Sequence, residues 1–175
     1  MKVAIDIGHA NETGARGNRM EEHAVVTVIG EHLRKILVKA GVQVDVIDYP
    51  NRTNDEDLAA TVAAINTGDY DLSVSLHCDC SSNESAHGAH VCYCSSTGAR
   101  VGEAVMFYLQ PIMPGRAERL VRRKLMVLTR TRCPAILVEC GFISHQGDAK
   151  KLRDESVRIA DAIAAGIQEW MGDKS

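Results

Sequence analysis

The sequence has few aromatic residues and no excess of positive charge. Aromatic side chains make up 4% of its 175 residues, and its formal net charge is −3. A nucleic-acid partner requires a positive field that attracts phosphates, and usually aromatic faces on which bases stack. The composition therefore predicts that nucleic acid is not a partner of this chain.

Long apolar runs are missing as well. No run approaches the roughly 18 residues that suggest a membrane-spanning helix, so we expect no membrane span. The first ten residues, MKVAIDIGHA, start directly with alternating apolar positions. A secretory signal instead has a basic stretch followed by an apolar one. We therefore expect synthesis in the cytoplasm without a signal peptide.

The six cysteines do not suggest the disulfide framework of a small secreted protein, because they are few and clustered. Four of them form two C-x-C pairs, Cys78 with Cys80 and Cys92 with Cys94. We expect mainly reduced thiols that pack as small apolar groups. A structural metal or a disulfide at these pairs are the alternatives, and the sequence alone does not choose between them.

Length and patterning predict one α/β domain. A chain of 175 residues can bury a core without crosslinks, so residues 1–175 are expected to form a single domain. Apolar periodicity switches repeatedly between two residues, typical of strands, and 3.6 residues, typical of helices. This alternation predicts a largely parallel or mixed sheet of about six strands with helices on both faces.

The expected elements follow from this periodicity and from turn and capping signals. The stretch 110–123, rich in Pro, Gly and Arg, is expected to be irregular and exposed. Strands are expected at 3–7, 42–47, 72–77, 90–94 and 135–138, and helices at 22–40, after the Thr53–Glu56 capping box, at 99–109 and over 159–170.

Polar residues stand at the ends of three expected strands. His9, His77 and Glu139 each follow an apolar strand, and Glu22 opens the first long helix. In open α/β sheets ligands bind at the carboxyl ends of the strands, so these residues can converge. Two histidines and one carboxylate suit catalytic zinc, which keeps a fourth position open, and the second carboxylate is then free for proton transfer. Singly, each residue also fits a structural role, such as a carboxylate favouring a helix N-terminus.

Through these four residues and the segments around them, the chain resembles the zinc-dependent N-acetylmuramoyl-L-alanine amidases of the amidase-3 type, which are found in phage endolysins and bacterial cell-wall hydrolases. The resemblance covers nearly the whole chain, and the segment PAILVECGFIS is its most specific part. The segments that carry it are IDIGHANETGARGN (5–18), EEHAVVTVIGEHL (21–33), LSVSLHCDC (72–80), GAHVCYCSS (88–96) and PAILVECGFIS (134–144).

The resemblance implies a role for each of the four residues. His9, Glu22 and His77 would hold one Zn²⁺ per chain, and Glu139 would be the catalytic carboxylate. Glu21 competes with Glu22 as a ligand. The family's ligand precedes apolar helix positions by 7 and 11 residues; counting from Glu22 these are Ile29 and Leu33, whereas from Glu21 they are Val28 and His32. No residue is assigned to substrate binding.

The implied reaction is hydrolysis of the amide between N-acetylmuramic acid and L-alanine in peptidoglycan or a muropeptide. Zinc lowers the pKa of bound water towards about 7, which supplies a nucleophile at neutral pH. Glu139 would take the proton of that water and pass it to the leaving amine. The enzyme would act on the cell wall after release or export, as a phage or prophage endolysin or as a host autolysin.

The chain departs from the family's pattern at several positions. Asp79 and His145 stand where the family often has Asn, and Thr129 where Arg is common; Arg130 or Arg132 is a possible replacement. These positions bear on substrate detail. A zinc peptidase or amidase for another small amide, and a non-catalytic peptidoglycan-binding module, are the alternative functions.

Two further polar features have both an ordinary and a functional interpretation. The basic segment from Arg116 to Lys124 is expected to be a solvated surface, or else to contact anionic groups of the wall or substrate carboxylates. The pair His87 and His90 is expected to lie in a partly exposed loop rather than to bind metal.

Overall fold

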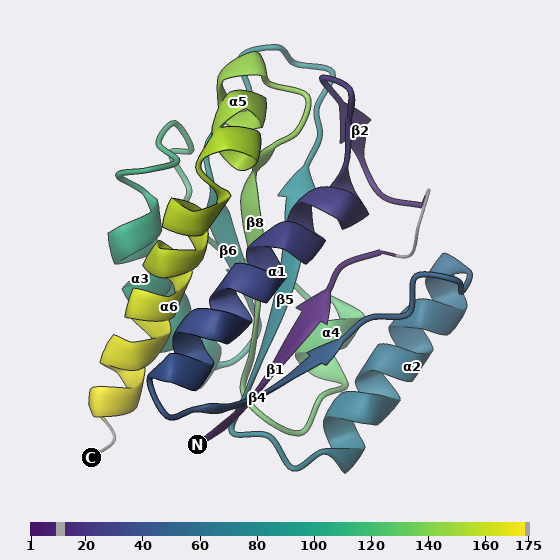
Figure 1. The fold of residues 1–175 in the computed structure, drawn as a ribbon, viewed down its shortest axis with the longest axis vertical. Helices are drawn as coiled ribbons and strands as arrows, with labels where there is room; N and C mark the ends of the chain where they lie inside the picture. The colour runs from purple at the N-terminus through teal and green to yellow at the C-terminus, as the bar shows by residue number, and fades with distance from the viewer. Residues whose placement is uncertain (10–12, 174–175) are drawn as a thin grey trace.

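The computed structural model describes residues 1–9 and 13–173. Residues 10–12, in the expected Gly-rich loop, lie outside this part. One six-stranded sheet forms the centre of the molecule, and helices cover both of its faces (Figure 1). The α/β fold class expected from the sequence is thereby confirmed.

The strands of the main sheet lie in the order β4-β1-β5-β8-β6-β7. Neighbouring strands run parallel except β6, which is antiparallel to β8. The sheet is therefore mixed. Its strands are β1 (Lys2–Ile7), β4 (Gln43–Ile47), β5 (Leu72–Asp79), β6 (His90–Tyr93), β7 (Leu120–Arg122) and β8 (Ala135–Phe142), and a separate hairpin consists of β2 (Arg16–Gly17) and β3 (Met20–Glu21).

Six helices accompany the sheet in the described residues. Figure 1 shows α1 and α6 side by side across one face, with α2 beside the β4 edge. The helices are α1 (Glu22–Lys39), α2 (Asn54–Thr67), α3 (Ser96–Leu109), α4 (Met126–Thr129), α5 (Gln146–Asp154) and α6 (Ser156–Gly172). None of them is long and apolar enough to cross a membrane.

Two apolar layers hold the helices on the sheet. The larger layer buries one side of α1, α3 and α6 against the central strands, with side chains such as Ile29, Leu76 and Ile163 fully buried. On the opposite face, Val62 of α2 and Leu128 of α4 pack with side chains of β6, β7 and β8. Removal of this apolar surface from water is the main favourable contribution to folding.

Strand alternation decides which side chains reach each layer. In β5, Leu72, Val74 and Leu76 belong to the larger layer, so the next residue, His77, points to the face covered by α2 and α4. In β8, Val138 likewise belongs to the larger layer, and Glu139 shares the face of His77. Both polar side chains thus leave the sheet on the same side.

The structure corrects two details of the expected secondary structure. The stretch 110–123 is not wholly irregular, because Leu120–Arg122 forms β7 and pairs with β6. The expected helix 99–109 begins three residues earlier, at Ser96, because the Ser95 side chain accepts a hydrogen bond from the Gly98 amide and caps it.

All six cysteines lie in the described part of the chain, and no disulfide joins any two of them. Cys78, Cys92 and Cys140 are buried, and Cys80 is exposed. Burial raises the pKa of the Cys92 thiol to about 11, so this thiol stays protonated at neutral pH.

Gly166 allows α3 and α6 to approach closely, and this contact gives a stability prediction. A Cβ at Gly166 would lie 2.4 Å from Cα of Val105, a backbone atom that cannot move aside cheaply. We expect Gly166→Ala to lower the free energy of unfolding by about 1–3 kcal/mol because the helices must separate. Gly172→Ala, in the same helix, is the control, since nothing lies within 4 Å of a Cβ there. Urea denaturation of both variants measures this; equal stability would contradict the prediction.

Candidate active site

His9 follows β1 at the carboxyl edge of the sheet, and a glycine makes room for its neighbours. The Gly8 amide donates to the Leu76 carbonyl at 3.0 Å, which fixes the end of β1 against β5. A Cβ on Gly8 would lie 2.4 Å from Cε1 of His77, so only glycine fits there. His9 itself adopts a left-handed backbone conformation, with φ of 62°.

Glu22, the first residue of α1, is buried at the junction of three segments and is only 2% exposed. Its Oε2 accepts a hydrogen bond from the Ala15 amide at 2.7 Å, and its Oε1 accepts one from the Cys78 amide at 2.9 Å. Burial alone would raise the pKa of Glu22, but these bonds and the His77 imidazole outweigh it and lower the pKa. The carboxyl is therefore held ionised.

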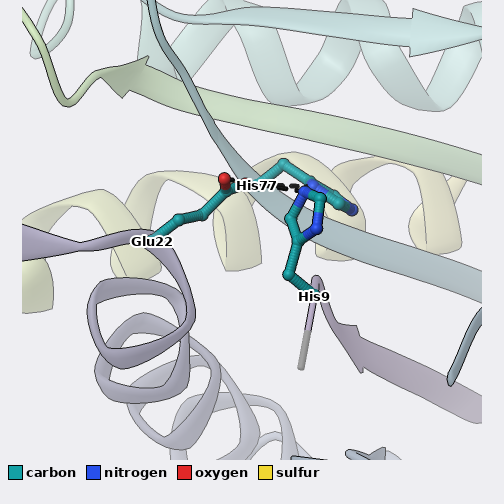
Figure 2. Close-up of side chains that lie close together, drawn as sticks. All are labelled: His9, Glu22 and His77. Carbon is teal, nitrogen blue, oxygen red and sulfur yellow. Dashed lines mark hydrogen bonds and ion pairs between the residues drawn. The ribbon is translucent and has the colours of Figure 1, made fainter. Parts of the chain in front are cut away.

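Three side chains converge around this carboxylate (Figure 2). Nδ1 of His77 lies 3.1 Å from Oε1 of Glu22, and Nε2 of His9 lies 3.6 Å from Oε2. The two imidazole rings meet edge to face, with centroids 5.0 Å apart. One ligand atom from each of the three residues lies within 4.8 Å of the others. Among residues 1–9 and 13–173, this is the group of His, Cys, Asp and Glu side chains gathered closely enough to hold an ion.

Glu21, the competing residue in the sequence, points elsewhere. It is the N-cap of α1, and its Oε1 lies 3.5 Å from the Arg16 guanidinium. The helix face explains the difference: Ile29, which follows Glu22 by seven residues, is fully buried, whereas Val28 is 48% exposed. The structure thus brings Glu22, and not Glu21, to His9 and His77.

Glu139 lies directly beside this cluster in the sheet. It is the register partner of His77 across the parallel β5–β8 pair and of His90 across the antiparallel β6–β8 pair. Its Oε2 is buried and has no hydrogen-bond partner in the described chain. Burial raises the pKa of Glu139 to about 7; the charge of His77 opposes this rise, and that of Asp79 adds to it. Both protonation states are accordingly accessible near neutral pH.

His90 is the site residue that the sequence interpretation missed. It begins β6, as expected for the strand 90–94, but it was also grouped with His87 in a partly exposed loop, whereas it is only 5% exposed. Burial and two nearby arginines lower its pKa to about 4, so its imidazole is neutral at physiological pH. Strand alternation from Val91, a fully buried core residue, is the sequence signal that places His90 on the face of Glu139.

A buried polar network around Asp6 lies near His77 in the sheet. Asp6 accepts hydrogen bonds from Ser75, its register partner in β5, and from Thr61 of α2. Burial raises the pKa of Asp6. Burial would lower the pKa of His77, but its hydrogen bond with Glu22 and the charges of nearby carboxylates, Asp6 among them, outweigh burial and raise this pKa. Asp6 also lines a cavity together with His77 and Asp57.

Residues that depart from the family pattern have identifiable contacts. Thr129 ends α4, and its hydroxyl donates to the Leu125 carbonyl at 2.9 Å. Nδ1 of His145 accepts from the Asp148 amide and caps α5. Arg130 and Arg132 precede the first residue of β8, whereas Glu139 lies within that strand.

Comparison with known proteins assigns this arrangement to a family. The sequence model of the N-acetylmuramoyl-L-alanine amidase family (Amidase_3) matches residues 3–169, nearly the whole chain. The chain belongs to the N-acetylmuramoyl-L-alanine amidase family. Membership makes it a hydrolase of the amidase class that acts on peptidoglycan.

Curated relatives of this amidase differ in length. YqiI of Bacillus subtilis (strain 168) is 29% identical over 96% of this chain and 84% of its own length. The N-acetylmuramoyl-L-alanine amidase LytC of the same organism is 27% identical over 96% of this chain, which spans only 35% of LytC.

Solved structures share the fold of this amidase closely. The catalytic domain of the CD27L endolysin targeting Clostridia difficile is 27% identical, with a TM-score of 0.89 over 97% of both chains. The N-acetylmuramoyl-L-alanine amidase AmiC2 of Nostoc punctiforme is 26% identical, with a TM-score of 0.86 over 98% of this chain and 97% of its own.

Asp57, in the wall of the cavity beside His77, gives a pH-dependent stability prediction. It is 6% exposed, and burial together with the charges of Asp6 and Asp48 raises its pKa from 3.8 to about 6. Because the folded state binds this proton more tightly than the unfolded state, the ionised side chain destabilises the fold above about pH 6. We expect Asp57→Asn to raise the free energy of unfolding of the metal-free protein by about 1–3 kcal/mol at pH 8.

That gain should shrink as the pH falls below about 6 and vanish near pH 4, where the carboxyl is protonated in both states. Denaturant titrations across this range measure it. Asp55→Asn is the control, because Asp55 is exposed in the same helical turn and should change stability by no more than about 0.5 kcal/mol. A gain that is independent of pH would contradict the assignment to Asp57.

Proposed function

We propose that residues 1–175 act as one zinc-dependent amidase domain that cleaves the amide between N-acetylmuramic acid and L-alanine, with His9, Glu22 and His77 as metal ligands and Glu139 as the catalytic carboxylate. The observation that carries this proposal is the position of the buried Glu139 carboxyl beside the three-residue cluster. Family membership supports the reaction class.

The donor set fits zinc in type and spacing. Two imidazoles and a carboxylate are the ligands of many catalytic zinc sites, in which ligand atoms lie about 3.3 Å apart on a tetrahedron. The separations of 3.1 Å and 3.6 Å from Glu22 to His77 and His9 are close to this value. When bound, zinc supplies a Lewis acid and a water of lowered pKa.

Hydrogen bonds and packing around Glu22 also support its role as a metal ligand. The Ala15 and Cys78 amides orient the two oxygens of Glu22 before any ion binds. A Cβ at Gly14 would lie 2.9 Å from Oε2 of Glu22, so this glycine leaves the carboxylate room against the loop. Such outer contacts fix ligand geometry and raise metal affinity.

Glu139 has the properties that proton transfer requires. Its pKa of about 7 allows the carboxylate to accept a proton from the attacking water and, as the acid, to donate one to the departing nitrogen. An amide nitrogen leaves poorly unless it is protonated, so both steps matter. The neutral His90 on one side and His77 on the other keep Glu139 within a buried strip of the sheet.

The proposed substrate is peptidoglycan or a soluble muropeptide, with one zinc ion per chain. The chain would reach the wall after release or export, in the manner of an endolysin or an autolysin. Support comes from the similarity to a catalytic domain described as that of an endolysin and to bacterial amidases.

The ligand set leads to a metal-binding prediction. We expect about one zinc per chain in the wild type and a loss of affinity of more than about 100-fold in Glu22→Gln, since removing a ligand costs more than removing an outer contact. Elemental analysis after chelation and reloading measures this. Glu21→Gln, the same change at the neighbouring residue, should keep its zinc because Glu21 points to Arg16. Equal zinc loss in both variants would count against the proposed ligand.

The catalytic carboxylate leads to a separate activity prediction. We expect Glu139→Gln to keep its zinc but to release stem peptide about 10²–10⁴ times more slowly, because the amide cannot transfer the proton. Product analysis by mass spectrometry identifies the bond that is cleaved. Glu31→Gln, an exposed change on α1, serves as the control. A wild type that binds zinc without freeing the stem peptide from muramic acid would instead favour another amide or a binding module.

A further inference from the structure

A second cavity adjoins Glu139, and none of the three cluster residues lines it. In the sheet, Glu139 lies between His77 of β5 and His90 of β6. Residues of β5, β6 and β8 line the cavity, together with two residues of the basic segment. Its polar lining includes Asp79, His90, Arg116, Arg123 and Glu139.

One of the two guanidiniums in this cavity has no ion-pair partner among the described residues. The guanidinium of Arg116 lies 3.8 Å from Asp79 and 5.8 Å from the centre of the Phe142 ring. Arg123 makes no side-chain hydrogen bond or ion pair within the described residues, although it is near enough for its charge to lower the pKa values of His90 and Asp79. Arg116 is thus paired with Asp79, and Glu139 in the same lining forms no ion pair with Arg123, so the Arg123 guanidinium is left to bind an anion.

Polar atoms in the same wall are also unpartnered. Nδ1 of His90 and Oε2 of Glu139 are buried without a hydrogen bond in the described part of the protein. The Asp79 carboxylate is 3.6 Å from Nδ1 of His90, beyond hydrogen-bonding distance. Buried polar groups are normally satisfied, so unpaired ones beside a cavity indicate a place that a ligand or water completes.

The proposed reaction indicates which half of the substrate would lie at this cavity. Glu139 donates its proton to the departing nitrogen, so the amine half of the substrate extends past Glu139. The acyl half lies on the side of His9, Glu22 and His77. The cavity with the two arginines is therefore positioned to contact the amine half, which is the peptide.

We propose that Arg116 and Arg123 form a subsite for a carboxylate on the peptide side of the scissile amide, an inference that rests on the proposed function. Arginine suits this role because its planar guanidinium binds a carboxylate through two parallel hydrogen bonds. The subsite would make the enzyme prefer peptides whose carboxylate close to the cleaved bond is free over those in which it is amidated.

Other members of the basic segment are excluded by their positions. Arg119 donates to Oε1 of Gln110 at 3.0 Å. Arg122 is an exposed residue at the end of β7. Neither lines the cavity beside Glu139. Arg122 therefore offers a matched control, adjacent in sequence to Arg123 and identical in charge.

The test uses two N-acetylmuramoyl-L-alanyl peptides that differ only in the carboxylate of the residue after L-alanine, free in one and a carboxamide in the other. We expect the zinc-loaded wild type to cleave the acid with at least tenfold higher kcat/KM. In Arg116→Gln/Arg123→Gln, kcat/KM for the acid should fall at least tenfold more than kcat/KM for the carboxamide, so the preference for the acid is lost. Arg122→Gln should match the wild type on both substrates.

Single variants, together with measurements of folding and zinc content, distinguish loss of the subsite from misfolding. Arg123→Gln removes no ion pair of the described structure, so it should fold normally and carry part of the loss. Arg123→Lys keeps the charge but not the two-bond geometry, and we expect intermediate activity on the acid. Circular dichroism and zinc content verify each variant.

The possible outcomes separate the two proposals. Equal wild-type activity on the acid and the carboxamide, or equal losses on both in the double variant, would overturn the carboxylate subsite and leave the amidase function standing. A zinc-loaded wild type that cleaves neither peptide, nor intact peptidoglycan, would overturn the proposed function and this subsite with it.

Discussion

The site depends on the hydrogen bonds and charge interactions of the buried Glu22 carboxylate. It joins the start of α1 to the end of β5 through the Cys78 amide, and to the loop after β1 through the Ala15 amide. A buried charge is costly unless it is compensated, and here two amides and the His77 imidazole compensate it. Because α1 also packs on the sheet through Ile29 and Leu33, the position of the helix and the geometry of the cluster are set together.

A second constraint is the mixed sheet around β8. The antiparallel partner β6 sets His90 beside Glu139, while the parallel partner β5 sets His77 on its other side. The flanking strands bury the Glu139 carboxyl, and this desolvation raises its pKa. Strand alternation turns the same side chain toward the face on which it lines a cavity. The chemistry of this carboxyl is thus a property of strand order rather than of its own sequence neighbours.

These two constraints arrange the polar groups along the carboxyl edge of the sheet. The three-residue cluster adjoins Glu139 through its register partner His77, and two arginines line a cavity that Glu139 also lines. The network of Asp6, Ser75 and Thr61 lies beneath His77 and fills the space that an apolar core would otherwise take. Buried polar groups are tolerated here because most of them are paired, and the unpaired ones adjoin cavities.

Apolar periodicity and the ends of strands are local properties, so they predicted the α/β class, the alternation within β5 and the candidate residues His9, Glu22, His77 and Glu139. These patterns did not predict β7, and they did not assign His90, at the start of the expected strand 90–94, to the site. A three-residue strand and a histidine between glycine-rich and apolar segments have weak local signals, and pairing with distant strands stabilises them. Glu22, which the apolar positions of the helix already favoured over Glu21, contacts both histidines in the structure. Which basic residues line the cavity beside Glu139 follows only from the packing: Arg116 and Arg123 do so, and the other residues of the basic segment do not. The physical reason is that burial, charge compensation and pKa depend on contacts between residues far apart in the chain, which no local pattern specifies.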